Sequence, residues 1–351
     1  MIPIDRELPL PKPIAIIIPT SKPLDQLQRT LSSLQRTVTD SAEILIIQNG
    51  PLSDSHTARS LTDQFASLKI RCLHEATPGL LSGRHRGVQE STSEIISFID
   101  DDIEVGPRWA EAIFQNFNNP DVKLVGGPST AEYACSVPEW LDAFFHRSPN
   151  EQWCTYLSLL ELGDQRTEMP PNLIWGLNFS IRRSALLELG GFHPDGVPWN
   201  LRRFRGDGES AVTEAARRCN MTAIYDPNVA VTHLIPKTRL TPNYFQRRAH
   251  LQGISDSYTQ LRNTHLHGAP PTSPPEKNSI RERLSFVVKQ QIGLSKNPMN
   301  KAIFQTQKAY REGYLYHQRQ FQIERVIREW VLRPDYWDYS YPLESKSNET
   351  A

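Results

Sequence analysis

Short apolar runs alternate with longer amphipathic segments through the first hundred residues, and this alternation limits the fold more than any other feature. The run IAIIIPT (Ile14–Thr20) carries no polar side chain before its last residue, which is typical of a strand buried on both faces. Leucines then recur at the spacing of one helix face, at Leu24, Leu27, Leu31 and Leu34. Further strands are predicted at 42–50, 69–75 and 94–100, with helices at 60–68 and 82–92. The order predicts an α/β fold with a mostly parallel central sheet flanked by helices.

Charge and composition indicate a globular chain that does not bind nucleic acid. Lysine and arginine number 39, as do aspartate and glutamate, so the formal net charge is zero. A general nucleic-acid binder carries an excess of positive charge, so that class of function is excluded. The apolar run is far too short to span a bilayer, and the four cysteines are widely spaced, as in reduced cytosolic proteins. The expected location is cytoplasmic, with peripheral contact at the inner membrane face as an alternative.

A proline-rich segment divides the chain. The stretch GAPPTSPPEKNS (268–279) has the composition of a linker. It predicts a catalytic domain over residues 1–267 and a helical C-terminal extension over residues 280–351. Plain packing of the extension on the catalytic domain is favoured, and a homodimer contact or an approach to a lipid-linked acceptor at a membrane surface are alternatives. Other elements are predicted as helices at 184–192, 210–220 and 300–333 and as a late strand pair within 222–233.

Three consecutive aspartates, Asp100, Asp101 and Asp102, follow the predicted strand 94–100. The carboxyl ends of parallel strands form the ligand edge of such a sheet, and Thr20, Gln48 and Asn49 also fall there. Carboxylates two residues apart point to the same side and can bind one divalent cation, which phosphate oxygens then complete. A solvated acidic turn is the alternative, and the position at the ligand edge favours the metal.

Other polar clusters could serve catalysis or simply structure. In GDGES, Asp207 and Glu209 lie among glycines before a helix, where a carboxylate could act as a general base or as a helix cap. His233 ends an apolar run, where a lone histidine is more often structural than a ligand. Arg84 and Arg239 could bind phosphate or lie exposed in basic turns.

Taken in order, these segments resemble the inverting glycosyltransferases of family 2, which have the GT-A fold. The similarity covers roughly residues 14–261. The matching stretches are IIIPT, IIQNG, GRHRG, FIDDDIEVGPRW, WGLNFSIRRSALLELGGFHPD, GDGES and VTHLIP. The ordered set is far more specific than any one of its members.

The resemblance implies a role for each matching residue. Asp100 and Asp102 would form the family's D-x-D pair. Asp102 would bind Mn²⁺ or Mg²⁺ directly, Asp100 would face the ribose or the metal's water shell, and His233 would complete the metal or diphosphate contacts. The residues expected at the nucleotide sugar are Pro19, Thr20, Gln48, Asn49, Arg84, Asp100, Asp101, Trp175, Asn178 and Arg239.

The implied reaction is transfer of a sugar from a nucleoside-diphosphate donor to a hydroxyl of a saccharide, a lipid-linked molecule or a small molecule, with inversion. Ser210 replaces the aspartate that commonly serves as base, so the base is Glu209 or Asp207, with Glu209 preferred. Gln48 replaces an aspartate that accepts a hydrogen bond from uracil, which leaves thymidine and guanosine donors open as well as uridine. Two alternatives are a sugar-phosphate nucleotidyltransferase and a non-catalytic nucleotide- or sugar-binding module. The glycine-free PTSKPLDQL after the first strand argues against the former, and the retained carboxylates argue against the latter.

Overall fold

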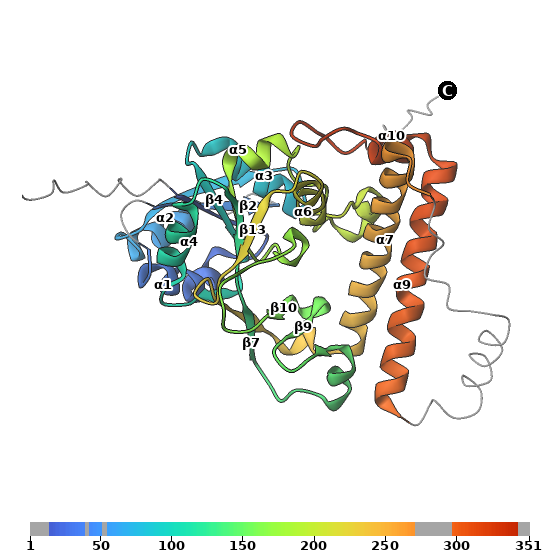
Figure 1. Cartoon of the computed structure of the whole chain (residues 1–351), viewed down its shortest axis with the longest axis horizontal. Coiled ribbons are helices and arrows are strands. Elements are labelled where there is room, and N and C mark those ends of the chain that lie inside the picture. The colour runs from blue at the N-terminus through green and yellow to red at the C-terminus, as the bar shows by residue number, and fades with distance from the viewer. Residues whose placement is uncertain (1–13, 39–41, 51–54, 271–296, 343–351) are drawn as a thin grey trace, which may run out of the picture.

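The computed structural model describes residues 14–38, 42–50, 55–270 and 297–342. Most of the predicted linker 268–279, and the predicted extension at 280–296 and 343–351, lie outside these residues. Within them, the predicted α/β fold and the C-terminal helices are confirmed (Figure 1).

The main sheet has eight strands in the order β11-β13-β6-β12-β4-β1-β2-β3. Strands β4, β1, β2 and β3 run parallel, as predicted, whereas β12 runs antiparallel to both β4 and β6. The bounds are β1 (Ile14–Thr20), β2 (Ala42–Asn49), β3 (Lys69–Glu75), β4 (Ile95–Ile99), β6 (Val122–Gly126), β11 (Thr167–Glu168), β12 (Asn178–Arg182) and β13 (Thr222–Tyr225).

Both faces of this sheet are buried, which explains the apolar runs. Successive residues of a strand point to opposite faces, so Ala15 and Ile17 belong to one core cluster and Ile16 and Ile18 to the other. Helices α3, α5 and α6 pack on the first face and α1, α2 and α4 on the second. Their bounds are α1 (Gln28–Gln35), α2 (Ser55–Gln64), α3 (Leu80–Glu90), α4 (Trp109–Phe117), α5 (Arg183–Glu188) and α6 (Glu209–Arg218).

A second, six-stranded sheet was not predicted. It has the order β5-β14-β7-β10-β9-β8, and the predicted late strand pair is wrong as a pair, because β13 joins the main sheet and β14 joins this one. Its strands are short, so none gives a strong periodic pattern. Their bounds are β5 (Ile103–Val105), β7 (Ser129–Tyr133), β8 (His146–Arg147), β9 (Gln152–Cys154), β10 (Leu159–Glu161) and β14 (Val231–Ile235).

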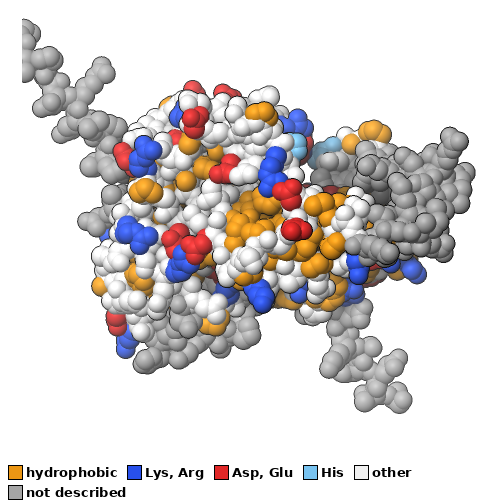
Figure 2. Space-filling view, turned by 90° about the horizontal axis from the view of Figure 1, so that it is seen from below, with side chains coloured by type: hydrophobic (Ala, Val, Ile, Leu, Met, Phe, Trp, Pro, Cys, Tyr) orange, Lys and Arg blue, Asp and Glu red, His pale blue; other side chains and the backbone are white. Residues whose placement is uncertain are grey.

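Figure 2 views the molecule from below and shows apolar side chains gathered near the middle of that face, with charged side chains around them. Within the described residues, no helix has both the length and the hydropathy to cross a membrane. Short 3₁₀ helices complete the connections: η1 (Leu24–Leu27), η2 (Glu139–Phe144), η3 (Thr155–Leu157), η4 (Pro171–Leu173), η5 (Trp199–Phe204) and η6 (Lys237–Arg239).

Two long helices, α7 (Pro242–His267) and α9 (Pro298–Ile323), lie side by side along one side of the molecule (Figure 1). Thr241 and Asn297 cap their N-termini by accepting hydrogen bonds from backbone N–H groups, and each cap precedes a proline. The helices cross at two glycines. A Cβ on Gly313 would lie 1.9 Å from the carbonyl oxygen of His250, and one on Gly253 would lie 2.0 Å from that of Tyr310.

The chain after α9 returns to the main sheet. Helix α10 (Arg325–Val331) leads into a segment, 333–342, that packs on the outside of α3. There the ring of Trp337 stacks on that of His85, with centroids 3.9 Å apart, and the Tyr341 hydroxyl donates a hydrogen bond of 2.9 Å to the carbonyl oxygen of Pro78. The last described residues are therefore part of the support of α3.

Candidate active site

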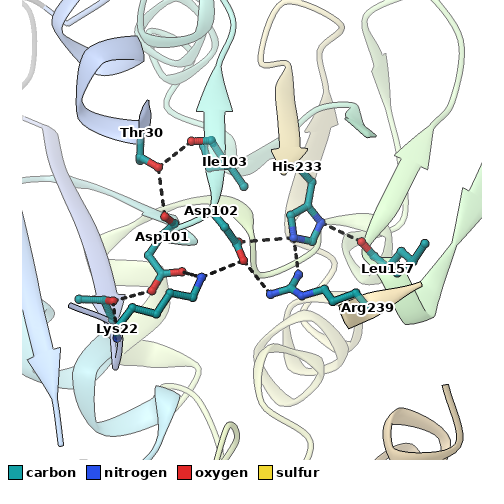
Figure 3. Close-up of polar contacts among 9 residues, drawn as sticks. Lys22, Thr30, Asp101, Asp102, Ile103, Leu157, His233 and Arg239 are labelled. Carbon is teal, nitrogen blue, oxygen red and sulfur yellow. Dashed lines mark hydrogen bonds and ion pairs between the residues drawn. The ribbon is translucent and has the colours of Figure 1, made fainter. Parts of the chain in front are cut away.

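The carboxyl ends of β1 and β4 meet at Asp101, as the parallel order predicts. Thr20 Oγ1 donates a hydrogen bond to Asp101 Oδ2 at 2.5 Å. The Lys22 ammonium lies 2.5 Å from Asp101 Oδ1 and 3.0 Å from Asp102 Oδ2 (Figure 3). Lys22 was not predicted as a site residue, because its partners lie about 80 positions away in the sequence. Asp101 is thus held between a hydroxyl and an ammonium group.

Strand pairing brings His233 to Asp102. Strand β5 begins directly after the aspartates and pairs with β14, where His233 lies opposite Ile103. His233 Nε2 lies 3.4 Å from Asp102 Oδ1. His233 Nδ1–H donates to the carbonyl oxygen of Leu157 at 2.8 Å, which leaves the Nε2 lone pair directed toward Asp102 and Arg239 (Figure 3).

Arg239 completes the charge pattern around Asp102. One of its terminal nitrogens, Nη2, lies 2.7 Å from Asp102 Oδ2, and the other, Nη1, donates to His233 Nε2 at 2.6 Å. Burial would raise the pKa of Asp102, but the polar contact with His233 and the positive charges of Arg239 and Lys22 outweigh it and hold that pKa well below its usual range. Asp102 is therefore an ionised carboxylate.

Asp100 has the opposite environment. Burial, and then the charge of Asp102, raise the pKa of Asp100 to about 6, against the opposing effect of Arg84 and His233. A buried carboxylate beside an ionised one is stabilised by any additional positive charge. Both carboxylates therefore favour a cation at this edge.

The residues present fit a divalent cation in part. Asp102 supplies a carboxylate oxygen, which Mn²⁺ and Mg²⁺ both accept, and His233 supplies an imidazole nitrogen, which suits Mn²⁺ better than Mg²⁺ and now accepts from Arg239. Among the described residues, no group of three or more His, Cys, Asp or Glu side chains is arranged to hold a metal ion. A cation bound here would take its remaining ligands from water and phosphate oxygens, as Mg²⁺ commonly does.

Arg84 lies close enough to Asp100 for its charge to act on that carboxyl, and it holds Glu209. Arg84 is 2% exposed; its Nη1 donates to Glu209 Oε2 at 3.3 Å and its Nη2 to the carbonyl oxygen of Gly176 at 3.0 Å. The Gly176 N–H in turn donates to Glu209 Oε1 at 3.2 Å. A Cβ on residue 176 would lie 2.4 Å from Arg84 Nη2, so only glycine permits this approach.

The two candidate bases differ in their surroundings. Both oxygens of Asp207 are engaged, one with His193 Nδ1 at 2.8 Å and the other with the Thr259 hydroxyl at 2.7 Å. The side chain of Asp207 is 7% exposed, whereas that of Glu209 is 27% exposed. Glu209 is therefore the carboxylate that a bound molecule can reach.

Two of the other predicted site residues use their side chains within the protein. The Asn49 amide binds the backbone of the loop before α3, at Thr77 and Gly79. Asn178 is buried, accepts from the Trp109 indole and donates to the carbonyl oxygen of Val229. Both asparagines therefore fix the backbone around the site.

The remaining predicted residues lie at the ligand edge or beneath it. Gln48 lies opposite Thr20 at the last register pair of β1 and β2 and is half-buried. Pro19 is buried beneath the Gly83 turn of α3, and Trp175 packs partly buried on the core. Gln48 is thus the member of this set that is open to solvent at the ligand edge.

A cavity of about 580 Å³ opens beside Glu209, between α6 and α7. Asp195 and Arg205, which form an ion pair at 2.5 Å, lie in its wall. Sequence reasoning did not find this cavity, because its lining comes from η4, α6, α7 and three further loop segments, and no single segment contains a motif.

Known proteins resemble this chain in sequence and in fold. The family model described as Glycosyl transferase family 2 matches residues 15–190, half of the 351-residue chain. The glucosyl-dolichyl phosphate glucuronosyltransferase of Haloferax volcanii is 22% identical over 240 residues, covering 68% of this chain and 73% of that protein. The validoxylamine A glucosyltransferase of Streptomyces hygroscopicus is 23% identical over 206 residues, covering 53% of this chain and 48% of that protein.

A solved structure has a similar overall fold. The mannosyltransferase PcManGT from Pyrobaculum calidifontis, in complex with GDP-Man and Mn²⁺, matches with a TM-score of 0.54 at 13% identity, covering 88% of this chain and 87% of that one. Together with the family match over β1 to α5, this similarity identifies the fold. The chain belongs to glycosyltransferase family 2, and it is a glycosyltransferase with the GT-A fold.

Proposed function

We propose that this protein is an inverting glycosyltransferase that moves a sugar from a nucleoside-diphosphate donor to a hydroxyl acceptor, assisted by Mn²⁺ or Mg²⁺. The observation that carries the proposal is the position of Arg84. Its charge acts on Asp100, and its guanidinium binds Glu209. The aspartate edge and a reachable carboxylate therefore both interact with one buried side chain. Two relatives are named for glucuronosyl and glucosyl transfer, which supports the reaction class.

On the donor side, Asp102 and His233 would hold the cation, and Asp100 would lie beside it. A cation there would neutralise the negative charge that develops on the departing diphosphate. Lys22 and Arg239 already direct two positive charges to the same carboxylate and are suited to bind phosphate oxygens. The solved PcManGT structure contains GDP-Man and Mn²⁺, which supports a donor and a cation of these kinds. Thr20 and Gln48 lie at the adjacent strand ends, where they would meet the nucleoside.

On the acceptor side, Glu209 would take the proton from the attacking hydroxyl. The acceptor oxygen forms a bond to the anomeric carbon as the bond from that carbon to the diphosphate oxygen breaks. The proton passes to the Glu209 carboxylate, and the nucleoside diphosphate leaves with the electron pair. Attack opposite the leaving group inverts the anomeric centre. Arg84 and the Gly176 N–H hold both oxygens of Glu209, which fixes its orientation for this transfer.

A thermal-shift screen of nucleoside diphosphates, with and without Mn²⁺, tests the donor side. The cognate nucleotide should raise the melting temperature by mass action, and the shift should depend on the metal. Donors with a radiolabelled sugar are then tested with candidate acceptors. NMR of the product of a pair that transfers the label gives the anomeric configuration. Retention of configuration would contradict the proposed mechanism, and the absence of a shift with every nucleotide would contradict the proposed enzyme class.

A further inference from the structure

The cavity beside Glu209 has an unusually polar wall. It lies between α6 and α7, and every lining residue is polar or charged except Ala269 and Pro270. Glu209, the proposed base, is part of the wall. A volume of about 580 Å³ is within the range of small-molecule sites. The side chains of the wall offer many hydrogen-bonding groups, and the apolar stems between them can lie against the faces of a sugar ring, so the wall suits a hydroxyl-rich ligand.

The charges of the wall are unbalanced. Five carboxylates face two guanidinium groups: Asp195, Asp207, Glu209, Glu214 and Asp256 against Arg205 and Arg248. Neighbouring arginines neutralise three of the carboxylates, since Arg205 pairs with Asp195, Arg84 with Glu209, and Arg217 with Glu214.

Two carboxylates lack such a partner. Among the described residues, neither Asp207 nor Asp256 forms an ion pair with a lysine or an arginine. Asp256 accepts hydrogen bonds from the Tyr310 hydroxyl at 2.6 Å and from the Gln252 amide at 2.7 Å. Burial, and to a smaller extent the charge of Asp207, raise the pKa of Asp256. Arg248 in the same wall offsets one of these two negative charges, and a cation bound in the cavity would relieve the other.

We infer that the cavity between α6 and α7 is the acceptor site and that its ligand is a small polyhydroxylated molecule bearing a protonated amine, such as an amino sugar or an aminocyclitol. The hydroxyls would meet the polar wall, the ammonium group would lie near Asp207 and Asp256, and one hydroxyl would face Glu209. This inference rests on the proposed function and names the acceptor class of the same site. An anionic lipid-linked acceptor is disfavoured, because carboxylates outnumber arginines in the wall.

Three monosaccharides that differ at one position test the inference. Glucosamine, N-acetylglucosamine and glucose carry an ammonium, a neutral amide and a hydroxyl at the same carbon. NMR titration of the full chain should give a dissociation constant about tenfold lower for glucosamine than for either neutral sugar. Octyl phosphate, which combines an anionic head with an alkyl chain, should not displace it. Equal affinity for the three sugars, or displacement by octyl phosphate, would overturn the inference.

Variants of the cavity wall test where the preference for glucosamine arises. Asp256→Asn keeps the shape and one hydrogen-bond acceptor but removes the charge, and it should reduce the preference for glucosamine to about threefold or less. The matched control is Asp164→Asn, at an exposed aspartate in a second cavity, which should leave the preference unchanged. If Asp256→Asn does not fold, Asn263→Lys adds a cation to the same wall and should weaken glucosamine binding about tenfold. If the folded variants keep the full preference for glucosamine, the amine does not bind at Asp256 or in this cavity.

The metal-dependent nucleotide shift separates the two proposals. If that shift is present and glucosamine shows no preference, only the acceptor class is wrong. If no nucleotide gives a shift, the proposed transferase chemistry itself fails, whatever the sugars do.

Discussion

Arg84 Nη1 lies 3.3 Å from Glu209 Oε2, although the two residues are 125 positions apart in the chain. Arg84 comes from the first turn and a half of α3, and Glu209 opens α6. The buried guanidinium therefore fixes the carboxylate that lies at the edge of the cavity. The contact links the side of the site that would bind the donor to the side that would bind the acceptor.

Replacement of Glu209 by glutamine should stop proton transfer while leaving donor binding intact. General-base catalysis typically contributes 10² to 10⁴-fold, so kcat should fall by about that range, and the metal-dependent nucleotide shift should persist. The comparison is Asp207→Asn, whose oxygens already bind His193 and Thr259 and whose kcat should fall less than about tenfold. A larger loss in Asp207→Asn than in Glu209→Gln would reverse the assignment of the base.

Asp102→Asn should weaken Mn²⁺ binding in the presence of the nucleotide by at least about tenfold, because it removes a charged oxygen beside His233. Isothermal titration of Mn²⁺ into the protein with a saturating nucleoside diphosphate measures this change. Asp121→Asn changes an exposed carboxylate at the turn before β6 and serves as the control. Unchanged Mn²⁺ affinity in Asp102→Asn would exclude Asp102 as the metal ligand.

Gly313→Ala should separate α9 from α7. The new Cβ would lie 1.9 Å from the carbonyl oxygen of His250, so the helices must move apart, at a cost of about 1–3 kcal/mol in the free energy of unfolding. Urea denaturation gives the change, and Lys308→Ala on an exposed part of α9 is the control. Since α7 forms one wall of the cavity, weaker binding of glucosamine should accompany the loss of stability. Equal stability of the two variants would mean that the helices do not cross at these glycines.

The stability of the protein should fall as the pH drops from 8 to 5, in part because of His85. Desolvation lowers the pKa of His85 to about 3 in the folded protein, against about 6.5 when unfolded. Below pH 6.5 the unfolded chain binds a proton at this histidine and the folded protein does not. The free energy of unfolding is therefore not reduced by His85 above pH 6.5, and it falls as the pH drops toward 3. Between pH 8 and pH 5 the loss is about 2 kcal/mol.

Urea denaturation at several pH values measures this slope, and His85→Gln is the test variant. Glutamine can still accept from the Phe192 N–H and donate to the carbonyl oxygen of Tyr336 as His85 does, but it does not titrate. The variant should therefore lose about 2 kcal/mol less than the parent protein over this range. His317, whose pKa burial lowers to about 4, and His250, whose pKa burial also lowers, should produce the remaining histidine dependence. An identical slope in both proteins would show that His85 is not the titrating group.

Strands β1, β2 and β4 were predictable because each is buried on both faces, so its own sequence is mostly apolar. Residues Ile14–Thr20 and Ala42–Asn49 became β1 and β2 as predicted. Helix α7 gave no such signal, since it packs between the core and α9. Its buried residues, among them Phe245, Ile254 and Tyr258, therefore do not gather on one face.

The convergence of the aspartate edge with Thr20 followed from the parallel order alone. The contact of His233 with Asp102 did not, because it depends on the pairing of β14 with β5, and only the family resemblance pointed to His233. Lys22 and the cavity wall were missed for the same reason. Their positions are set by contacts between segments distant in sequence, such as Lys22 with Asp101, and no local pattern encodes them.

The Tyr341 hydroxyl binds the carbonyl oxygen of Pro78, which lies 263 positions earlier in the chain. This separation determines the order in which parts of the protein fold. Helix α3, which carries Arg84, leaves the ribosome long before the segment that covers its outer side has been made. Contacts of such sequence separation form late and slow the overall folding rate. The nascent chain should therefore gain its sheets first and a rigid Arg84 last, so that catalytic competence appears only after the segment around Trp337 and Tyr341 has been synthesised and docked.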